Sequence, residues 1–221
     1  MTATTPIGII VGMRSEAALL AKGAMIGCSG GNPTRAAQIA DYMLQTGADG
    51  LISFGIAGGL LPGLMPGALV IGSAVDLDGV SLPCDQAWSR RLANVLPTAQ
   101  CGIVCGVSDA VLTPTAKAAL HNVSNGLTVD LESGAVAEAC AAAGKPFAVL
   151  RGVADPADRA IPAFALSGLA ADGRMRVLPV LLGLLRRPLM LPALLGLARD
   201  SRKALTSLGA AARLLDASLG F

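Results

Sequence analysis

Three carboxylates in this chain stand where side chains commonly do chemistry. Glu16, Glu132 and Asp155 each lie beside the end of a short apolar segment that predicts a strand. A site with several carboxylates usually handles polyols, metals or glycosidic bonds. Because cleavage of a glycosidic bond passes through an oxocarbenium-like transition state, one acid should protonate the leaving group and another should activate the nucleophile. This set of acids is therefore a candidate for glycosidic-bond cleavage.

Each acid also has a purely structural interpretation. Glu16 and Glu132 could be first-turn helix acids, which the helix dipole stabilises. Asp155 precedes Pro156 and could simply form a turn. The residues alone leave both interpretations open for all three.

The sequence gives other chemistries little support. It has no Gly-Lys-Ser/Thr phosphate loop, and its one histidine, His121, argues against Ser-His-Asp catalysis. Five cysteines lie among apolar residues without the paired spacing of a zinc site, and they indicate reduced thiols in a cytoplasmic protein. The net charge of +2 is too small to indicate nucleic-acid binding. We therefore expect no metal, no organic cofactor and no nucleic-acid partner.

Short apolar strands that alternate with helices should position these acids. The chain of 221 residues is long enough for one large domain, and its 53% hydrophobic but only 3% aromatic content indicates a core of small side chains. The alternation predicts a three-layer α/β domain over residues 1–166, with a mostly parallel mixed sheet flanked by helices. Residues 167–221 are predicted to be a C-terminal apolar helical extension packed on that domain.

Two of the acids belong to one stretch, Thr128 to Pro162. Ser133 to Ala143 favours a helix, and Phe147 to Val153 predicts a buried parallel strand. Asp155 then lies at the carboxyl end of that strand, where open α/β sheets bind their ligands.

Two further elements are expected around the third acid. A helix is predicted over Arg14 to Lys22, and a strand over Gly50 to Phe54. That strand runs into the glycine-rich segment Gly55 to Gly59, where glycine permits a backbone path that side chains would block.

The C-terminal extension has a different composition from the rest of the chain. Its two apolar runs, Val177 to Leu185 and Leu189 to Ala198, are each about half of the roughly 20 residues that a bilayer-spanning helix needs. Short apolar helices with arginines at their ends could lie in a membrane interface through residues 175–200, or cover an apolar substrate. A buried helical layer or a dimer contact is an equally good interpretation of the composition.

Four segments resemble the superfamily of purine nucleoside phosphorylases and methylthioadenosine/adenosylhomocysteine nucleosidases, in the order found there. They are I-G-I-I-V-G-M-R-S-E (7–16), S-F-G-I-A-G-G-L (53–60), V-D-L-E-S-G-A-V-A (129–137) and V-L-R-G-V-A-D-P-A-D (149–158). The resemblance covers about residues 6–160. Within the superfamily, S-G-G-N-P (29–33) and the Leu/Arg/Pro-rich tail look most like the hopanoid-associated phosphorylase branch, which acts on adenosylhopane.

The resemblance implies a role for each acid. It gives Asp155 the purine-recognising position, where an aspartate helps to protonate N7 so that adenine leaves as a neutral base. It implies that Glu132 binds the ribose hydroxyls and that Leu131 lies under the sugar. It also implies that Glu16 orients the attacking water, as in hydrolytic members. Retention of Glu16 favours hydrolysis over phosphorolysis.

The resemblance also implies the surroundings of the substrate. Gly58 is placed at the substrate, and Val111 stands where an aromatic would stack on adenine, so that purine packing would rest on Phe54 or Phe147 or would be looser. Phosphate remains an alternative co-substrate to water. Backbone N–H groups near a helix start bind anions, so the residues that could hold phosphate are Arg14, Arg35, Gly30 and Gly31.

The sequence therefore predicts an enzyme that releases adenine from adenosylhopane, giving ribosylhopane by hydrolysis or its phosphorylated form by phosphorolysis. The family's usual state implies a homodimer. The expected location is the cytoplasm, with peripheral contact to the inner face of the membrane. One alternative is a soluble methylthioadenosine, adenosylhomocysteine or futalosine nucleosidase, and another is a non-catalytic nucleoside-binding or scaffolding protein.

Overall fold

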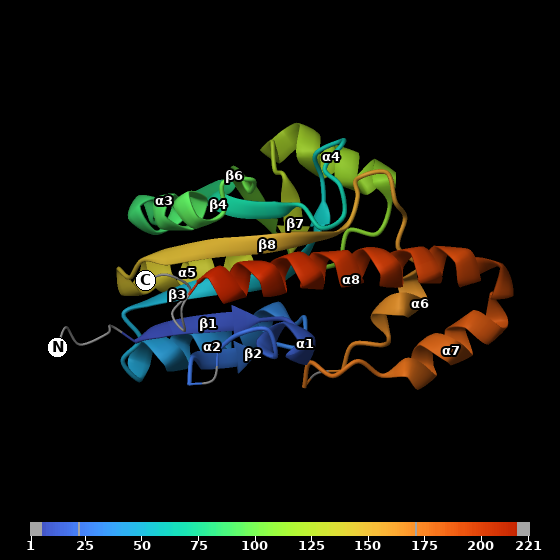
Figure 1. Cartoon of the computed structure of the whole chain (residues 1–221), viewed down its shortest axis with the longest axis horizontal. Coiled ribbons are helices and arrows are strands. Elements are labelled where there is room, and N and C mark those ends of the chain that lie inside the picture. The colour runs from blue at the N-terminus through green and yellow to red at the C-terminus, as the bar shows by residue number, and fades with distance from the viewer. Residues whose placement is uncertain (1–5, 22, 171, 216–221) are drawn as a thin grey trace.

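The structure is a computed structural model, and it describes residues 6–21, 23–170 and 172–215. An eight-stranded sheet forms its centre, with helices on both faces (Figure 1). The strands are β1 (Ile7–Val11), β2 (Met25–Cys28), β3 (Gly50–Gly59), β4 (Leu69–Leu77), β5 (Val80–Pro83), β6 (Gln100–Gly106), β7 (Thr128–Asp130) and β8 (Phe147–Asp155).

The helices account for most of the remaining chain. They are α1 (Arg14–Ala17), α2 (Pro33–Gln45), α3 (Gln86–Val95), α4 (Pro114–Ser124), α5 (Ser133–Ala143), α6 (Ala163–Leu166), α7 (Val177–Arg186), the 3-10 turn η1 (Pro188–Met190) and α8 (Leu191–Leu214). Asn32, Asp85 and Thr113 cap α2, α3 and α4 by accepting backbone N–H bonds.

The sheet is mixed but mostly parallel, as the sequence predicted. Five of its eight strand pairings are parallel and three are antiparallel. The order is β2-β1-β3-β7-β6-β4-β5, and β8 pairs with both β3 and β4. The pairings of β3, β7, β6, β4 and β8 therefore close a ring, so the carboxyl ends of β3 and β8 meet residues from β7 at one edge.

Two apolar clusters give the molecule its three layers. On one face, small residues of α2 and α5 such as Ala40 and Ala137 pack against Ile10 and Val149. On the other face, α3 and α8 cover the sheet: Leu92 and Leu208 pack with Ile9, Ile52 and Leu150. The α/β fold and the C-terminal helix are thus confirmed. Helix α8 packs on the sheet. The boundary at residue 166 between the domain and its extension stays a prediction.

Three elements differ from the prediction. Helix α1 ends at Ala17 instead of Lys22, because the chain must turn at Gly23 (φ +95°) before β2 begins. Strand β3 continues through the glycine-rich segment to Gly59, pairing there with β7 and β8. Helix α8 runs on to Leu214, since the polar residues that follow the apolar run are also good helix formers.

Candidate active site

All three predicted acids line one pocket of about 260 Å³, where the carboxyl ends of β3 and β8 meet β7. Glu16 comes from α1, Glu132 from the start of α5, and Asp155 from the last residue of β8. The remaining lining is mostly apolar and consists of Gly12, Met13, Gly31, Ile56, Ala57, Gly58, Val107, Ala110, Val111, Val129, Asp130, Leu131, Ala154, Ile161, Ala165, Leu166, Leu169, Met175, Leu197 and Ser201.

Backbone N–H groups hold the carboxylate of Glu16 in place. Its Oε2 accepts from the N–H groups of Gly12 (2.9 Å) and Met13 (2.7 Å), and its Oε1 accepts from Ile56 N–H (2.7 Å). A carboxylate offers about four acceptor sites, so one remains for a bound water or a substrate. Burial, and next the charge of Glu132, raise the pKa of Glu16 to about 7, which suits a general base near neutral pH.

Glu132 faces Glu16 across Gly12. A methyl group at Gly12 would lie 2.7 Å from Glu132 Oε1 and 3.5 Å from Glu16 Oε2, so both carboxylates border the same small space. Ser29 Oγ donates to Glu132 Oε1 (3.0 Å). Burial raises the pKa of Glu132, and the neighbouring Arg151 guanidinium opposes that rise. Two buried acids this close favour sharing a proton.

Arg151 lies at the centre of the polar cluster, fully buried on β8. Its Nε donates to Asp130 Oδ2 (2.8 Å), and its Nη2 donates to the hydroxyls of Ser53 and Ser133. Its Nη1 is buried and has no hydrogen-bond partner among the described residues. This N–H pair is close to Glu16, because a methyl group at Gly55 would lie 2.8 Å from Arg151 Nη1 and 2.6 Å from Glu16 Oε1.

Asp155 is paired with Lys117, which comes from α4. Lys117 is completely buried, and its Nζ donates to Asp155 Oδ2, to the carbonyl oxygen of Pro156 (2.9 Å) and to that of Arg159 (3.1 Å). All three ammonium donors are therefore used. Burial raises the pKa of Asp155, and Lys117 opposes that rise.

Glycines make the space that these charged groups occupy. A methyl group at Gly58 would meet Asp155 Oδ2 at 3.3 Å, and those at Gly12 and Gly55 would overlap Glu132 and Glu16. The glycine-rich end of β3 is thus ordinary strand backbone whose missing side chains leave room for carboxylates.

Some of the other predicted binding residues line the pocket and some do not. Leu131, Gly58 and Val111 line the pocket with the acids. Phe54 is buried in the core among apolar residues and Phe147 starts β8, eight residues or about 26 Å of strand from Asp155. Neither phenylalanine lines the pocket, so the expectation that one of them packs on the purine is corrected. Apolar side chains such as Val111 and Ile161 are the pocket's available packing surface.

The residues expected to hold phosphate are only partly assembled. Gly31 lines the pocket, but Leu169 covers it: a methyl group there would lie 2.7 Å from Leu169 Cδ2. Its N–H already donates to Ser29 Oγ (3.1 Å). Arg14 and Arg35 are exposed, and neither they nor Gly30 line the pocket. Arg14 donates through Nε to the carbonyl of Asp172 (3.0 Å).

Sequence reasoning missed Lys117, Arg151 and Ser29 as site residues. The arginine had a signal, because a lone charge inside an apolar strand must find partners when the strand is buried. Lys117 had none, since a lysine on a helix is usually exposed. The apolar extension from residue 175 was considered as a cover for an apolar substrate, but the wall from α6 and the residues after it, Leu166 and Leu169, was missed because no local pattern brings them to the acids.

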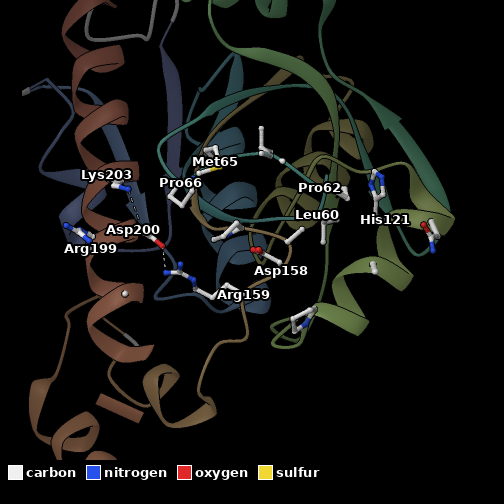
Figure 2. Close-up of a pocket in the computed structure, with 18 residues that line it drawn as sticks. Leu60, Pro62, Met65, Pro66, His121, Asp158, Arg159, Arg199, Asp200 and Lys203 are labelled. Carbon is white, nitrogen blue, oxygen red and sulfur yellow. Dashed lines mark hydrogen bonds and ion pairs between the residues drawn. The ribbon is translucent and has the colours of Figure 1, made fainter. Parts of the chain in front are cut away.

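A larger cavity, of about 690 Å³, lies on the other side of the loop after β8 (Figure 2). Leu60, Pro62 and Met65 are among its apolar lining residues, and Arg159, Asp200 and Lys203 form an ion-paired group in its lining. Asp200 accepts from Arg159 and lies 3.6 Å from Lys203. This cavity holds none of the three acids. Its ion pairs tie α8 to the loop that carries Asp155.

Among the described residues, no cluster of His, Cys, Asp and Glu is arranged to bind a metal ion. Over the same part of the chain, no helix combines the length and apolar character needed to cross a bilayer.

Comparison with known proteins identifies the family. Residues 19–172 match the model of the Phosphorylase superfamily, and the chain belongs to that superfamily. No curated protein matches the sequence. The chain is similar to solved structures whose identity is low enough that they show the fold alone.

Three of these structures illustrate the likeness. The 5′-methylthioadenosine/S-adenosylhomocysteine nucleosidase of Neisseria meningitidis, in complex with methylthio-immucillin-A, is 17% identical, with a TM-score of 0.71 and coverage of 95% of this chain and 98% of that one. S-adenosylhomocysteine nucleosidase of Streptococcus pyogenes is 18% identical, with a TM-score of 0.66 and the same coverage. A futalosine hydrolase mutant of Helicobacter pylori is 18% identical, with a TM-score of 0.61, covering 66% and 88%.

Proposed function

We propose that this protein hydrolyses the N-glycosidic bond of an adenine nucleoside whose 5′ position bears a large hydrocarbon, with adenosylhopane as the substrate. The observation that carries the proposal is one pocket that joins Glu16, Glu132 and Asp155 to an apolar wall from residues 165–197. Acids suit the ribosyl reaction, and the wall suits the hydrocarbon.

Glu16 acts as the general base towards water. Three N–H donors fix its carboxylate, and its pKa of about 7 lets it accept a proton near neutral pH. The unpartnered Nη1 of Arg151 borders the same space, so a water held between Glu16 and Arg151 would satisfy both groups. Loss of its proton to Glu16 makes that water the nucleophile.

Glu132 binds the ribose and the charge that develops on it. Its Oε2 lies 3.9 Å from Arg151 Nη2, and Ser29 donates to its other oxygen, so the carboxylate is oriented before substrate enters. The polar cluster contains Glu16, Asp130 and Glu132 but a single cation, Arg151. Its excess negative charge stabilises an oxocarbenium-like transition state.

Asp155 protonates the leaving adenine at N7. Burial raises its pKa, which favours the protonated carboxyl that a general acid requires. Lys117 holds the carboxyl group by donating to Oδ2, and its charge opposes the rise in the pKa of Asp155. These opposing effects let Asp155 both release a proton and regain one. Adenine then leaves as a neutral base, which is far easier than expelling an anion.

The residues that were predicted to hold phosphate are not arranged to do so, and this favours hydrolysis over phosphorolysis. Leu169 covers Gly31, and Arg14 is engaged with Asp172 outside the pocket. For phosphate to bind there, Leu169 would have to move off Gly31 and Arg14 would have to leave Asp172. Water can bind without either change.

A soluble substrate is the second candidate, because the solved structures of similar fold include nucleosidases whose names specify 5′-methylthioadenosine and S-adenosylhomocysteine. A lipid-linked substrate would place the enzyme at the cytoplasmic face of a membrane. Whether the chain forms a homodimer stays a prediction.

A substrate comparison tests the proposal. Purified protein is incubated without phosphate with adenosylhopane in detergent, and separately with 5′-methylthioadenosine in the same detergent, and adenine is quantified. We expect kcat/KM for the lipid nucleoside to exceed that for the thionucleoside by about tenfold or more, since each buried CH₂ contributes about 0.8 kcal/mol. Equal or reversed preference would assign the pocket to a soluble nucleoside, and release that requires phosphate would contradict hydrolysis.

A further inference from the structure

Large apolar side chains gather on one surface of the molecule and face solvent there. Of the 17 exposed large hydrophobic residues among those described, 11 fall within residues 166–195. Nine of them form what we call the leucine face, on α7, η1 and the start of α8, and two more border the pocket. The leucine face consists of Val177, Leu178, Leu181, Leu182, Leu185, Leu189, Met190, Leu191 and Leu195.

Helix α7 is apolar on both of its sides. Its inner side packs on α6: a methyl group at Gly183 would lie 2.7 Å from the ring of Phe164, and one at Gly168 would lie 2.6 Å from Val180. Its outer side carries five members of the leucine face, at spacings that form one continuous stripe. Because the inner contacts are already made, the outer stripe has no partner in the described part of this chain, and it is not a buried helical layer.

The leucine face projects from the body of the protein. Helix α7 and the first turns of α8 extend beyond the edge of the sheet, while the rest of α8 lies along β8 (Figure 1). Leu189, at the tip, is 92% exposed. A projecting apolar surface of this size is unusual on a monomer and marks a contact with something apolar.

Only one sign of charge accompanies these side chains. Five exposed arginines lie between Asp172 and Asp200, and no aspartate or glutamate does. They are Arg174, Arg176, Arg186, Arg187 and Arg199. Cations bordering an apolar surface match the phosphates and acyl chains of an anionic bilayer. They match a second copy of this surface poorly, because among the described residues only Arg174 has an acid beside it, Asp172 at 3.3 Å, and a two-fold contact would add four further arginines from each copy without adding an acid between them.

The leucine face is continuous with the pocket. Leu166 and Met175 line the pocket beside the acids, and they are also 45% and 57% exposed. Leu197, on the same helix as Leu195, lines the pocket from the other side. Apolar side chains from residues 166–197 therefore contribute both to the exposed surface and to the wall of the pocket.

We propose that the leucine face docks on the surface of an anionic lipid bilayer, with its leucines among the acyl chains, its arginines at the phosphates and the pocket mouth turned towards the lipid. The ten-residue α7 lies in the interface rather than crossing it. Docking itself stands on the surface alone, whereas its use in supplying a lipid nucleoside rests on the proposed function.

Vesicle binding tests the proposal. The full chain is sedimented with vesicles of phosphatidylcholine alone, and with vesicles in which about a third of the lipid is phosphatidylglycerol. We expect binding to the anionic vesicles, weakened about tenfold or more by Leu185→Glu with Leu189→Glu, since charge on these side chains opposes burial in lipid. Arg186→Gln with Arg187→Gln should remove most of the preference for anionic lipid. Leu214→Glu, at the far end of α8 and also an exposed leucine, should bind like the parent.

Two further readouts separate the possible failures. Hydrolysis of 5′-methylthioadenosine, or of whichever adenine nucleoside the protein cleaves, should be unchanged in the leucine variants, because neither residue lines the pocket. If the parent protein cleaves no adenine nucleoside, the proposed hydrolysis is contradicted, but the proposed docking on lipid is not. Absence of vesicle binding by the parent, undiminished binding by the double leucine variant, or conversion of a dimer into a monomer by that variant would each overturn the proposal.

Discussion

Replacement of Asp155 by Asn should lower kcat for adenine release by about 10²–10⁴-fold, the usual contribution of a general acid. Asparagine has nearly the same shape and can still accept from Lys117, but it has no proton to give to N7. The fall should therefore appear in kcat more than in KM. Steady-state kinetics on any nucleoside that the protein cleaves, with folding checked by circular dichroism, measures this.

Asp158→Asn is the matched control, because Asp158 is an exposed acid three residues further along the same loop, outside the pocket. It should retain activity within a factor of about two. If Asp158→Asn were as damaging as Asp155→Asn, or if Asp155→Asn kept full turnover, the assignment of the acid would be wrong. Lys117→Met in the Asp155→Asn background should recover stability without recovering activity, since it removes a buried ammonium whose anionic partner is gone.

Replacement of Glu16 by Gln should separate activity from stability. Turnover should fall by about 10²–10⁴-fold, because the amide accepts no proton from water. The pKa of Glu16 is raised from 4.5 to about 7 in the folded protein, so the folded state binds more protons than the unfolded state between these values. The free energy of unfolding of the parent should then decrease as pH rises through that window, by about 3 kcal/mol in total.

The variant lacks this pH dependence, so its stability relative to the parent should increase by about 3 kcal/mol from pH 4 to pH 8. Urea unfolding of both proteins at several pH values measures the difference. Glu138→Gln, at an exposed position of α5, should run parallel to the parent at every pH. A constant difference between parent and Glu16→Gln would show that burial does not raise the pKa of Glu16.

The sheet and its main helices could be predicted because each is encoded locally. Ser133 to Ala143 has the composition of a helix and Gly144 ends it in the left-handed conformation (φ +62°), so α5 has the predicted bounds. Strand β8 was predicted from an apolar run that is indeed buried throughout. Where local signals conflicted, tertiary pairing decided: Gly55 to Gly59 has loop composition but is strand, because β8 pairs with it.

The acids of the site could be predicted, but their partners could not. Glu16, Glu132 and Asp155 each lie beside a predicted strand end, and the family resemblance decided between their catalytic and structural interpretations. Lys117 reaches Asp155 from a helix 38 residues earlier, and nothing in its local sequence distinguishes it from a surface lysine. Phe54 and Phe147 were predicted to pack on the substrate but do not line the pocket, because a large aromatic in a small-residue protein is most readily buried in the core.

The C-terminal extension shows a limit of composition as a guide. Leucine-rich runs are equally consistent with a buried layer, a dimer contact and a membrane surface. A buried layer is distinguished from the other two by whether its leucines contact the rest of the chain. Those contacts depend on how α6, α7 and α8 pack against one another, which composition does not specify.

Isotope labelling tests the central claim most directly. The protein is incubated with an adenine nucleoside in ¹⁸O-labelled water, without phosphate, and the sugar product is analysed by mass spectrometry. The proposed mechanism predicts stoichiometric adenine release and one ¹⁸O atom at the anomeric carbon, with both products formed about 10²–10⁴-fold more slowly by Glu16→Gln. Adenine release that occurs only after phosphate is added, yielding a sugar phosphate, would contradict water as the nucleophile and Glu16 as its base.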